Sequence, residues 1–330
     1  MQSPRTSIQN VSLIHPPGFY IIGLISLTYA NVYVIFLTVI YVITTFTNCF
    51  VICIICMDHH LHVPKFIAVG NLAVVDLVLS TSLIPSMIKI YLLKDNFIEY
   101  KLCLVQMYMY YAFLTLESFS IAILAFDRLI AICLPLRQNS INTTTTMTTI
   151  ITSIWILTIG TITISTSSMT YLSFCNSVQV NSYFCDYAPV FRLACNDNSL
   201  QWTFATVLSS VCIFVPLSFI VLSYTCILFS VFQMKSVESR FKALATCTEH
   251  LILVAIFYIP ILIIFMIGLF QVGINPDVRI VGLSLSSCIP PCTNPIIYSL
   301  KTKELKSRVH FLFQRTFNIQ RHSVRPLHKK

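Results

Sequence analysis

Charged residues are scarce in this chain: only 10% of its 330 residues are charged, whereas 56% are hydrophobic, and its mean hydropathy is +0.80. Soluble globular domains carry about 25% charged residues, so this composition excludes a soluble globular domain. Glycine is also scarce, with seven residues, and neither a phosphate-cradling glycine-rich loop, an H-E-x-x-H helix nor a nucleophile elbow occurs. The sequence therefore predicts an integral membrane protein that is not an enzyme.

Three further absences exclude specific features. The last apolar segment has no lysine between Arg279 and Lys301, so a retinal Schiff base has no amine there. No cysteine follows Cys292, so a palmitoylated tail anchor is not expected. The N-terminal segment lacks a basic start, an apolar core and a small-residue cleavage site. No removable signal peptide is therefore expected, and the first apolar segment should itself direct membrane insertion.

Seven apolar segments are long enough to cross a membrane, because a spanning helix needs about 20 mostly apolar residues. They cover roughly residues 30–56, 67–91, 103–133, 147–169, 203–232, 246–271 and 279–300. These spans predict an all-α fold, a seven-transmembrane helix bundle, with residues 1–29 as an extracellular segment, 30–300 as the membrane domain and 301–330 as a cytoplasmic tail. Secondary carriers usually show repeated halves with broken helices, and none is visible, so a membrane transporter is the weaker alternative.

The distribution of basic residues predicts the orientation. The side expected in the cytosol carries Lys65, Arg137, Lys235, Arg240, Lys242 and the basic tail. The N-terminus is then extracellular at the plasma membrane, and Asn10, in the sequon Asn10-Val11-Ser12, is a predicted glycosylation site. The net charge of +9 is concentrated in the tail, which indicates membrane lipids rather than nucleic acid as its partner.

The tail itself predicts a short helix. Apolar residues recur there at helical spacing with basic residues between them: Leu305, Val309, Leu312 and Phe313, with Lys306, Arg308 and Arg315. This pattern describes a basic amphipathic helix that lies on the cytoplasmic membrane surface and does not cross it.

Two acids, Asp76 and Glu117, lie inside apolar spans. Ionisable residues at membrane depth are rare and by default mark function. With Asn48 and Asn294 they could form an oxygen-rich cluster that binds a sodium ion, a small hard cation. The alternative is that both acids are protonated and hydrogen-bonded to their neighbours, because desolvation disfavours the charged form of a carboxyl group.

A charged pair, Asp127-Arg128, ends the third span. Because a salt bridge at a membrane edge is worth little net free energy, such a pair can break and re-form when something binds. The pair therefore favours a switch over a pore or a catalyst.

Thirteen cysteines sort by side of the membrane. Four fall on the outer side, where the compartment is oxidising: Cys103, Cys175, Cys185 and Cys195. Four cysteines allow three pairings, and spacing alone does not choose among them.

These features together resemble the rhodopsin-like (class A) G-protein-coupled receptors: the seven spans, Asp127-Arg128, the outer cysteines, Tyr224 and Asn294-Pro295-Ile296-Ile297-Tyr298. Within that class, three segments are similar to motifs of the odorant (olfactory) receptors, namely Leu61-His62-Val63-Pro64, Ala125 to Pro135 and Lys242 to His250. Leu129, Glu249 and Ile259-Pro260 depart from the pattern of that family. The departures suggest a divergent branch, such as fish-type members.

The resemblance implies two disulfides, Cys103–Cys185 and Cys175–Cys195. It also implies a G-protein switch formed by Asp127, Arg128, Tyr224, Glu249, Asn294, Pro295 and Tyr298. In this interpretation Asp127 holds Arg128 at rest and releases it on activation, and Glu249 adds a second hold on Arg128 or Lys242. The expected partner is a heterotrimeric G protein with a stimulatory/olfactory alpha subunit, which raises cyclic AMP.

The same resemblance implies a ligand pocket in the outer part of the bundle. Its expected residues are Tyr110, Tyr111, Leu114, Thr115, Ser118, Ser209, Cys212, Tyr258, Ile261, Leu262, Phe265, Ser284 and Ser287. No acid lies in the outer half of the third span, where amine receptors hold the charge of their ligand. A small-molecule odorant, largely apolar with one hydrogen-bonding group, fits best. A receptor for a peptide or a lipid is the alternative.

Overall fold

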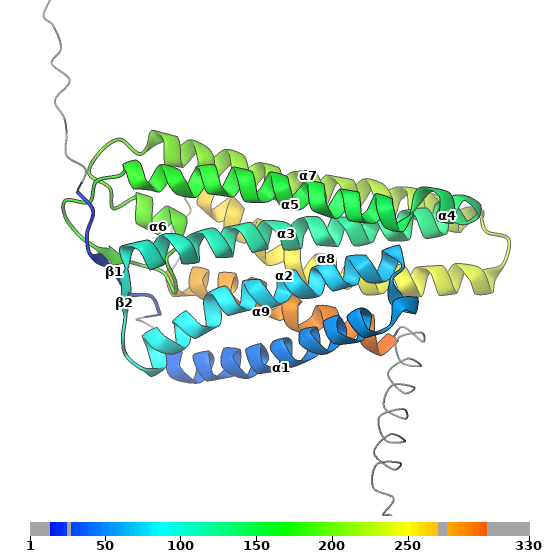
Figure 1. Cartoon of the computed structure of the whole chain (residues 1–330), viewed down its shortest axis with the longest axis horizontal. Coiled ribbons are helices and arrows are strands. Elements are labelled where there is room, and N and C mark those ends of the chain that lie inside the picture. The colour runs from blue at the N-terminus through cyan, green and yellow to red at the C-terminus, as the bar shows by residue number, and fades with distance from the viewer. Residues whose placement is uncertain (1–13, 25–27, 270–275, 302–330) are drawn as a thin grey trace, which may run out of the picture.

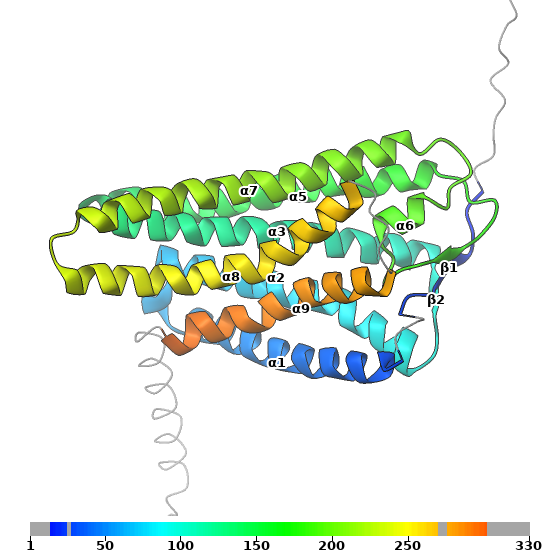
Figure 2. The ribbon, with the colours of Figure 1, turned by 180° about the vertical axis from the view of Figure 1, so that it is seen from behind.

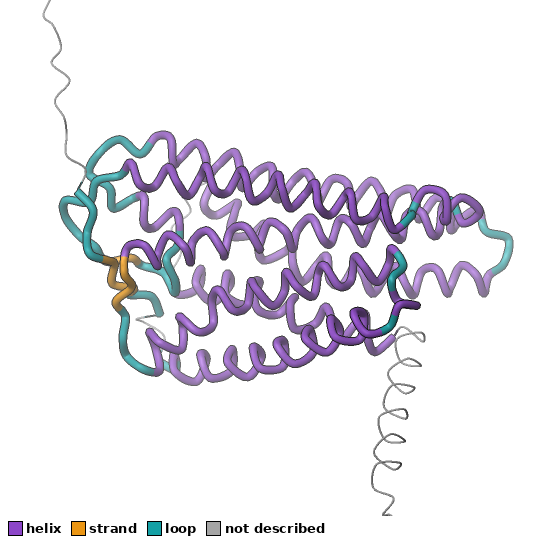
Figure 3. The backbone as a smooth tube through the Cα atoms, in the orientation of Figure 1, coloured by secondary structure: helices purple, strands orange, loops and turns teal. Residues whose placement is uncertain are grey.

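A computed structural model of the chain describes residues 14–24, 28–269 and 276–301, of which 268, 269, 276 and 298–301 are described as backbone only. Seven long helices dominate it (Figures 1 and 3): α1 (Ala30–Met57), α2 (Pro64–Met87), α3 (Tyr100–Cys133), α5 (Thr144–Ser167), α7 (Ser199–Gln233), α8 (Val237–Leu269) and α9 (Pro276–Lys301). The connections contain short helices: α4 (Gln138–Ile141), α6 (Tyr187–Phe191), 3-10 turns at His59–Leu61, Pro135–Arg137 and Ser168–Tyr171, and a π turn at Ile88–Leu92.

The long helices confirm the predicted seven-helix bundle. By length and hydropathy, α1, α2, α5, α7, α8 and α9 could each cross a membrane, and α3 is the seventh candidate when taken with Pro135–Ile141, which follow it after a bend of 110°. Several helices begin a turn earlier than the apolar pattern predicts, and α8 begins at Val237, well before residue 246. The helices continue into the polar interface of the membrane. The residues there are polar, so an apolar pattern does not predict where the helix begins.

A small sheet closes one end of the bundle. Its strands are β1 (Gly18–Ile21), β2 (Phe97–Glu99) and β3 (Gln179–Val180), in the order β2-β1-β3. β1 pairs antiparallel with β2 and parallel with β3. A Cβ on Gly18 would lie 2.2 Å from the Ile98 carbonyl oxygen, so only glycine fits this approach. The all-α expectation missed the sheet, because strands of two to four residues show no detectable alternation.

The end that carries this sheet is called the sheet end below, and the opposite end, which contains α4 and the connection from α7 to α8, the α4 end (Figures 1 and 2). α3 is the central helix, since it packs against α2, α5, α7 and α8. α1 packs on α2 and α9, and α8 packs on α9. The apolar core at the sheet end includes the buried rings of Phe19, Tyr183 and Phe184.

Two prolines leave helix carbonyls that residues of other helices satisfy. Pro216 lacks the N–H that would bond to the Cys212 carbonyl, and Ser118 Oγ of α3 donates to that oxygen at 2.9 Å. In the same way, Pro295 cannot bond to the Pro291 carbonyl, and Asn48 Nδ2 of α1 donates to it at 2.9 Å. Neighbouring helices thus supply the bonds that bent membrane helices require.

Candidate functional site

Two disulfides constrain the connection between α5 and α7, and one of them ties it to the sheet end. Cys103, in the first turn of α3, is bonded to Cys185, and Cys175 is bonded to Cys195. These are the pairs that the family resemblance implies. Because Cys185 is tied to α3, the residues that follow it, Asp186 and the helix α6, lie over the space between the long helices.

A cavity of about 240 Å³ opens beneath this connection. Residues of α3, α5, α6, α7, α8 and α9 line it, and most of the lining is apolar, including Leu114, Leu208, Phe257 and Phe265. One wall is polar and includes Tyr111, Asp186 and Arg279. A mostly apolar wall with a few polar groups is the usual form of a small-molecule site.

Nine of the residues expected to contact a ligand line this cavity: Tyr110, Tyr111, Leu114, Thr115, Ser118, Ser209, Cys212, Ile261 and Phe265. The remaining four, Tyr258, Leu262, Ser284 and Ser287, do not. Tyr258 Oη is bonded to Ser118 Oγ at 2.8 Å, and Leu262 packs in the core formed with α3 and α7. The Ser284 hydroxyl meets Tyr33 Oη of α1 at 2.6 Å, and that of Ser287 meets Tyr110 Oη at 3.0 Å. These hydroxyls are already partnered inside the bundle, which sequence spacing does not reveal.

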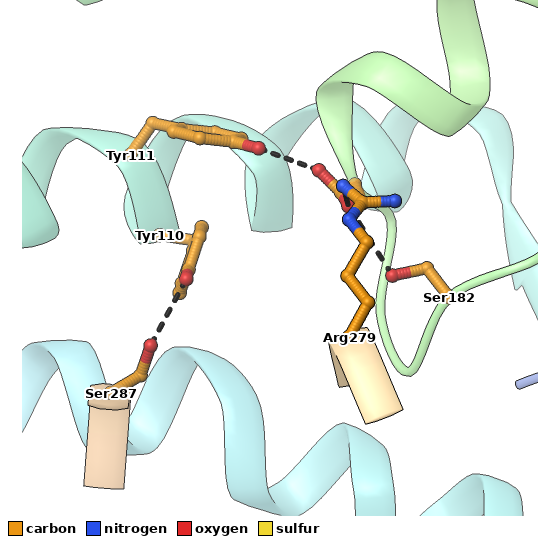
Figure 4. A network of polar contacts seen from close by, with 6 residues as sticks. Tyr110, Tyr111, Ser182, Arg279 and Ser287 are labelled. Atoms are coloured by element: carbon orange, nitrogen blue, oxygen red, sulfur yellow. Dashed lines mark hydrogen bonds and ion pairs between the residues drawn. The ribbon is translucent and has the colours of Figure 1, made fainter. Parts of the chain in front are cut away.

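Asp186 is the centre of the polar wall, and its three partners, Tyr111, Ser182 and Arg279, converge in Figure 4. Its side chain is buried, with 1% of the residue exposed. Tyr111 Oη donates to Oδ1 at 2.5 Å, while Arg279 Nη2, at 3.1 Å, and Ser182 Oγ, at 3.4 Å, donate to Oδ2. Arg279 is only partly buried, with 32% of its side chain exposed. The network joins the connection before α6 to α3 and α9, and it compensates the buried carboxylate.

The prediction of the pocket missed Asp186 and Arg279. That prediction rests on the outer half of the third span, which has no acid, whereas Asp186 lies in the connection before α6. The available signal was the position of Asp186 directly after Cys185, since the implied disulfide brings that residue to the head of α3. The neighbouring Tyr183 is fully buried, and this burial raises the pKa of its hydroxyl well above the usual range, so the phenol stays neutral.

A second polar cluster lies deeper in the bundle. Asp76 and Glu117 are both fully buried, and Asn294 Nδ2 donates to both carboxylate oxygens of Asp76 at 3.1 Å. Within the described residues, both oxygens of Glu117 and the amide oxygens of Asn48 and Asn294 have no hydrogen-bond partner. Unpartnered buried oxygens suit a hard cation. The described part of the chain holds no group of three His, Cys, Asp or Glu placed for a metal, so amide oxygens would have to complete the set.

At the α4 end, Asp127 does not pair with Arg128 in the described structure. Instead the buried Asp127 accepts a hydrogen bond from Asn142 Nδ2, at 2.8 Å, in the connection from α4 to α5. The reason is geometric, because consecutive residues of a helix do not face each other. Arg128 is half-buried and lies within electrostatic range of Tyr224 and His250.

A buried histidine near Arg128, His250 of α8, contacts residues of α7 and α3. His250 Nδ1 lies 2.7 Å from Tyr224 Oη of α7, and His250 Nε2 lies 3.2 Å from the Ile121 carbonyl oxygen of α3. Since a carbonyl only accepts, Nε2 carries the proton and Nδ1 accepts from Tyr224. Lys242, a suggested partner of Glu249, is bonded to Glu238 at 2.6 Å.

The remaining residues of the predicted switch and tail are only partly described. Asn294 and Pro295 lie in α9, whereas the side chain of Tyr298 is outside the description. Asn10 and the predicted amphipathic helix also lie outside the described residues.

The seven membrane-crossing helices and the cavity under a disulfide-held connection define the class of seven-helix membrane receptors. A family model described as olfactory receptor matches residues 37–315. Human olfactory receptor 52K1 is 31% identical over 93% of this chain and 98% of its own length, and human olfactory receptor 5F1 is 33% identical over 82% and 86%. Rat olfactory receptor 1500 is 31% identical over 83% and 87%. The chain belongs to the olfactory receptor family, and it is an odorant-type G-protein-coupled receptor and not an enzyme.

Proposed function

We propose that this receptor binds a small, largely apolar odorant in the cavity beneath Asp186 and activates a G protein of the stimulatory/olfactory type, so that cyclic AMP rises. The main observation that supports this proposal is the cavity. Its volume suits a small molecule and not a folded peptide, and its mostly apolar lining matches a largely apolar ligand.

The polar wall supports a ligand with one hydrogen-bonding group. Arg279 has five N–H donors, and its bond to Asp186 uses one of them. The cavity also receives the hydroxyls of Thr115 and Ser209. A ligand oxygen can therefore find a donor while its apolar part lies against Leu114 and Phe265.

We place the switch at the α4 end, which faces the cytosol in this proposal. Ligand binding biases α8 relative to α3 and α7, and Arg128 becomes available to the G protein. The bonds among His250, Tyr224 and Ile121 are the contacts that such a movement changes, because they join these three helices. A differential affinity of a few kcal/mol is enough to move a two-state equilibrium of this kind.

The proposal is tested by screening volatile and water-soluble small molecules on cells that express the receptor, with cyclic AMP as the readout. We expect a dose-dependent rise that Arg128→Ala removes at equal surface expression. A response that survives Arg128→Ala contradicts the switch. Signalling only through other G proteins contradicts the stimulatory type and favours the peptide or lipid alternative, and uptake or current without any G protein favours a transporter.

Glu249 remains a proposed second hold in this switch. Glu249→Gln is expected to raise basal cyclic AMP by removing a contact of the resting state. Unchanged basal signalling at equal surface expression contradicts this role.

We also propose that a sodium ion binds between Asp76 and Glu117, with the amide oxygens of Asn48 and Asn294. The support is the set of buried oxygens without hydrogen-bond partners. Replacing sodium by choline in the buffer should lower the melting temperature of the purified receptor, and Glu117→Gln should remove that difference. An equal sodium response in the variant contradicts the site and favours two protonated, hydrogen-bonded acids.

A further inference from the structure

A second hollow lies between α2 and α3, near the sheet end, away from the odorant cavity. Its volume is about 560 Å³, and residues of α2, the π turn, β2 and α3 line it. In Figure 1, α2 and α3 lie further apart where β2 joins them than near the middle of the bundle. Pro85 is part of this region, since it lies inside α2 just before the π turn.

The hollow is an open groove that faces the membrane. Leu102 and Val105 of α3, which line it, are each 56% exposed although both are apolar. Both lie in α3, and Val105 belongs to the predicted span 103–133 that Leu102 adjoins, so the medium around them is lipid. The groove therefore has an apolar wall that lipid chains can reach without crossing the bundle.

Gln106 and Ser82, two polar residues of the groove floor, are already partnered. Gln106 Nε2 donates to the Ser82 carbonyl at 3.0 Å, and Gln106 Oε1 accepts from the Cys185 N–H at 3.2 Å. The Ser82 hydroxyl donates to the Leu79 carbonyl at 2.7 Å. An occupant need not supply hydrogen bonds to these groups, so the floor accepts an apolar chain.

The rim at the sheet end differs, because it holds one cation. Lys89 Nζ donates to the Phe97 carbonyl at 2.8 Å and lies 3.3 Å from Asp95 Oδ2. An ammonium group has three donors, so one remains. The carboxylate partner is exposed, and exposed ion pairs are weak because water screens them, so a phosphate group can compete for this cation.

We propose that this groove is a binding site for one phospholipid, with an acyl chain along Leu102 and Val105 and the phosphate group at Lys89. In the proposed orientation of the receptor, this lipid belongs to the outer leaflet. A sterol fits less well, because its single hydroxyl does not need a cation at the rim. The bound lipid would also stabilise the α2–α3 contact that Gln106 bridges to Cys185.

The test uses the full-length receptor in nanodiscs that contain a phosphatidylcholine probe with a photoreactive diazirine in its acyl chain. We expect labelling of the peptide that contains Leu102 and Val105, and we expect Val105→Trp to reduce it at least fivefold by filling the groove. Ile156→Trp is the matched control, because Ile156 of α5 is 68% exposed and lies outside the groove. Equal labelling of wild type and both variants would show annular lipid only and overturn the proposal.

Two further measurements separate the alternatives. Lys89→Gln should reduce labelling by the phosphatidylcholine probe but not by a diacylglycerol probe, which lacks the phosphate. Stronger labelling of the same peptide by a photoreactive sterol would overturn the choice of phospholipid. If Val105→Trp does not fold, the test uses the wild-type protein and measures how unlabelled phosphatidylcholine reduces the photolabelling. A discrete site shows saturable competition, whereas annular contacts do not.

Discussion

At the scale of single residues, Asp186 decides how the polar wall of the odorant cavity is built. Its carboxylate accepts from three side chains on three parts of the chain, and it is almost fully buried. Removing charge here affects both stability and ligand recognition, since a buried group left without its partner costs its desolvation energy.

Asp186→Asn is expected to destabilise the receptor by about 1–3 kcal/mol, because an amide cannot accept from Tyr111, Ser182 and Arg279 at once. Thermal unfolding of the purified protein measures this loss. Asp95→Asn is the control, since it breaks an exposed pair worth about 0–1 kcal/mol. Equal melting temperatures for the two variants would contradict a structural role for the Asp186 network.

The bond between Tyr224 and His250 predicts a measurable coupling. Tyr224→Phe and His250→Phe each remove one partner, and each should lower stability by about 1–3 kcal/mol, since the other group is left buried. The double variant should lose less than the sum of the two. A double-mutant cycle on unfolding free energies measures the difference, and strict additivity would refute the contact.

At the scale of elements, the proline of α7 explains the role of Ser118 better than ligand contact alone. Ser118→Ala should cost about 1 kcal/mol, because the Cys212 carbonyl loses its donor. In a Pro216→Ala background the helix regains its own N–H, so most of this cost should vanish. The measurement is thermal unfolding of the wild type, the two single variants and the double variant. An equal cost in both backgrounds would show that Ser118 stabilises the receptor through its hydrogen bond to Tyr258 instead.

The two disulfides should contribute differently to the stability of the receptor. Cys103–Cys185 closes a separation of 82 residues and positions Asp186, whereas Cys175–Cys195 closes 20. In the loop-entropy account the longer loop contributes about 1 kcal/mol more. The double variant C103S/C185S should therefore unfold at the lower temperature and lose its odorant response. If C175S/C195S proves equally damaging to the response, the placement of Asp186 is not the reason.

At the scale of the whole molecule, the proposed orientation puts the sheet end outside the cell. Deglycosylation of the wild-type receptor should then increase its gel mobility, and Asn10→Gln should abolish that shift. Thr144→Ala, which removes the sequon at Asn142, should leave the shift unchanged, because this sequon lies at the α4 end and Asn142 is buried against Asp127. The opposite pattern would reverse the proposed orientation.

Some parts of the candidate site could be predicted and others could not, for reasons that differ by residue. Leu114, Thr115 and Ser118 follow from the position of α3 in the family pattern, and they line the cavity. Ser284 and Ser287 are predicted from the family pattern in the same way, yet their hydroxyls bond to Tyr33 and Tyr110. Spacing along one helix gives the face of a residue but not the partner that a neighbouring helix presents.

The sequence by itself determined the membrane environment, the seven spans and the family, because these depend on hydrophobic length and on motifs local in the chain. Only the tertiary structure decided which groups meet: Asp186 with Tyr111 and Arg279, and Asp127 with Asn142 rather than Arg128. The small sheet belongs to the same group, since its strands come from distant segments. Such contacts depend on the packing of several helices together, and no local pattern in the chain records that packing.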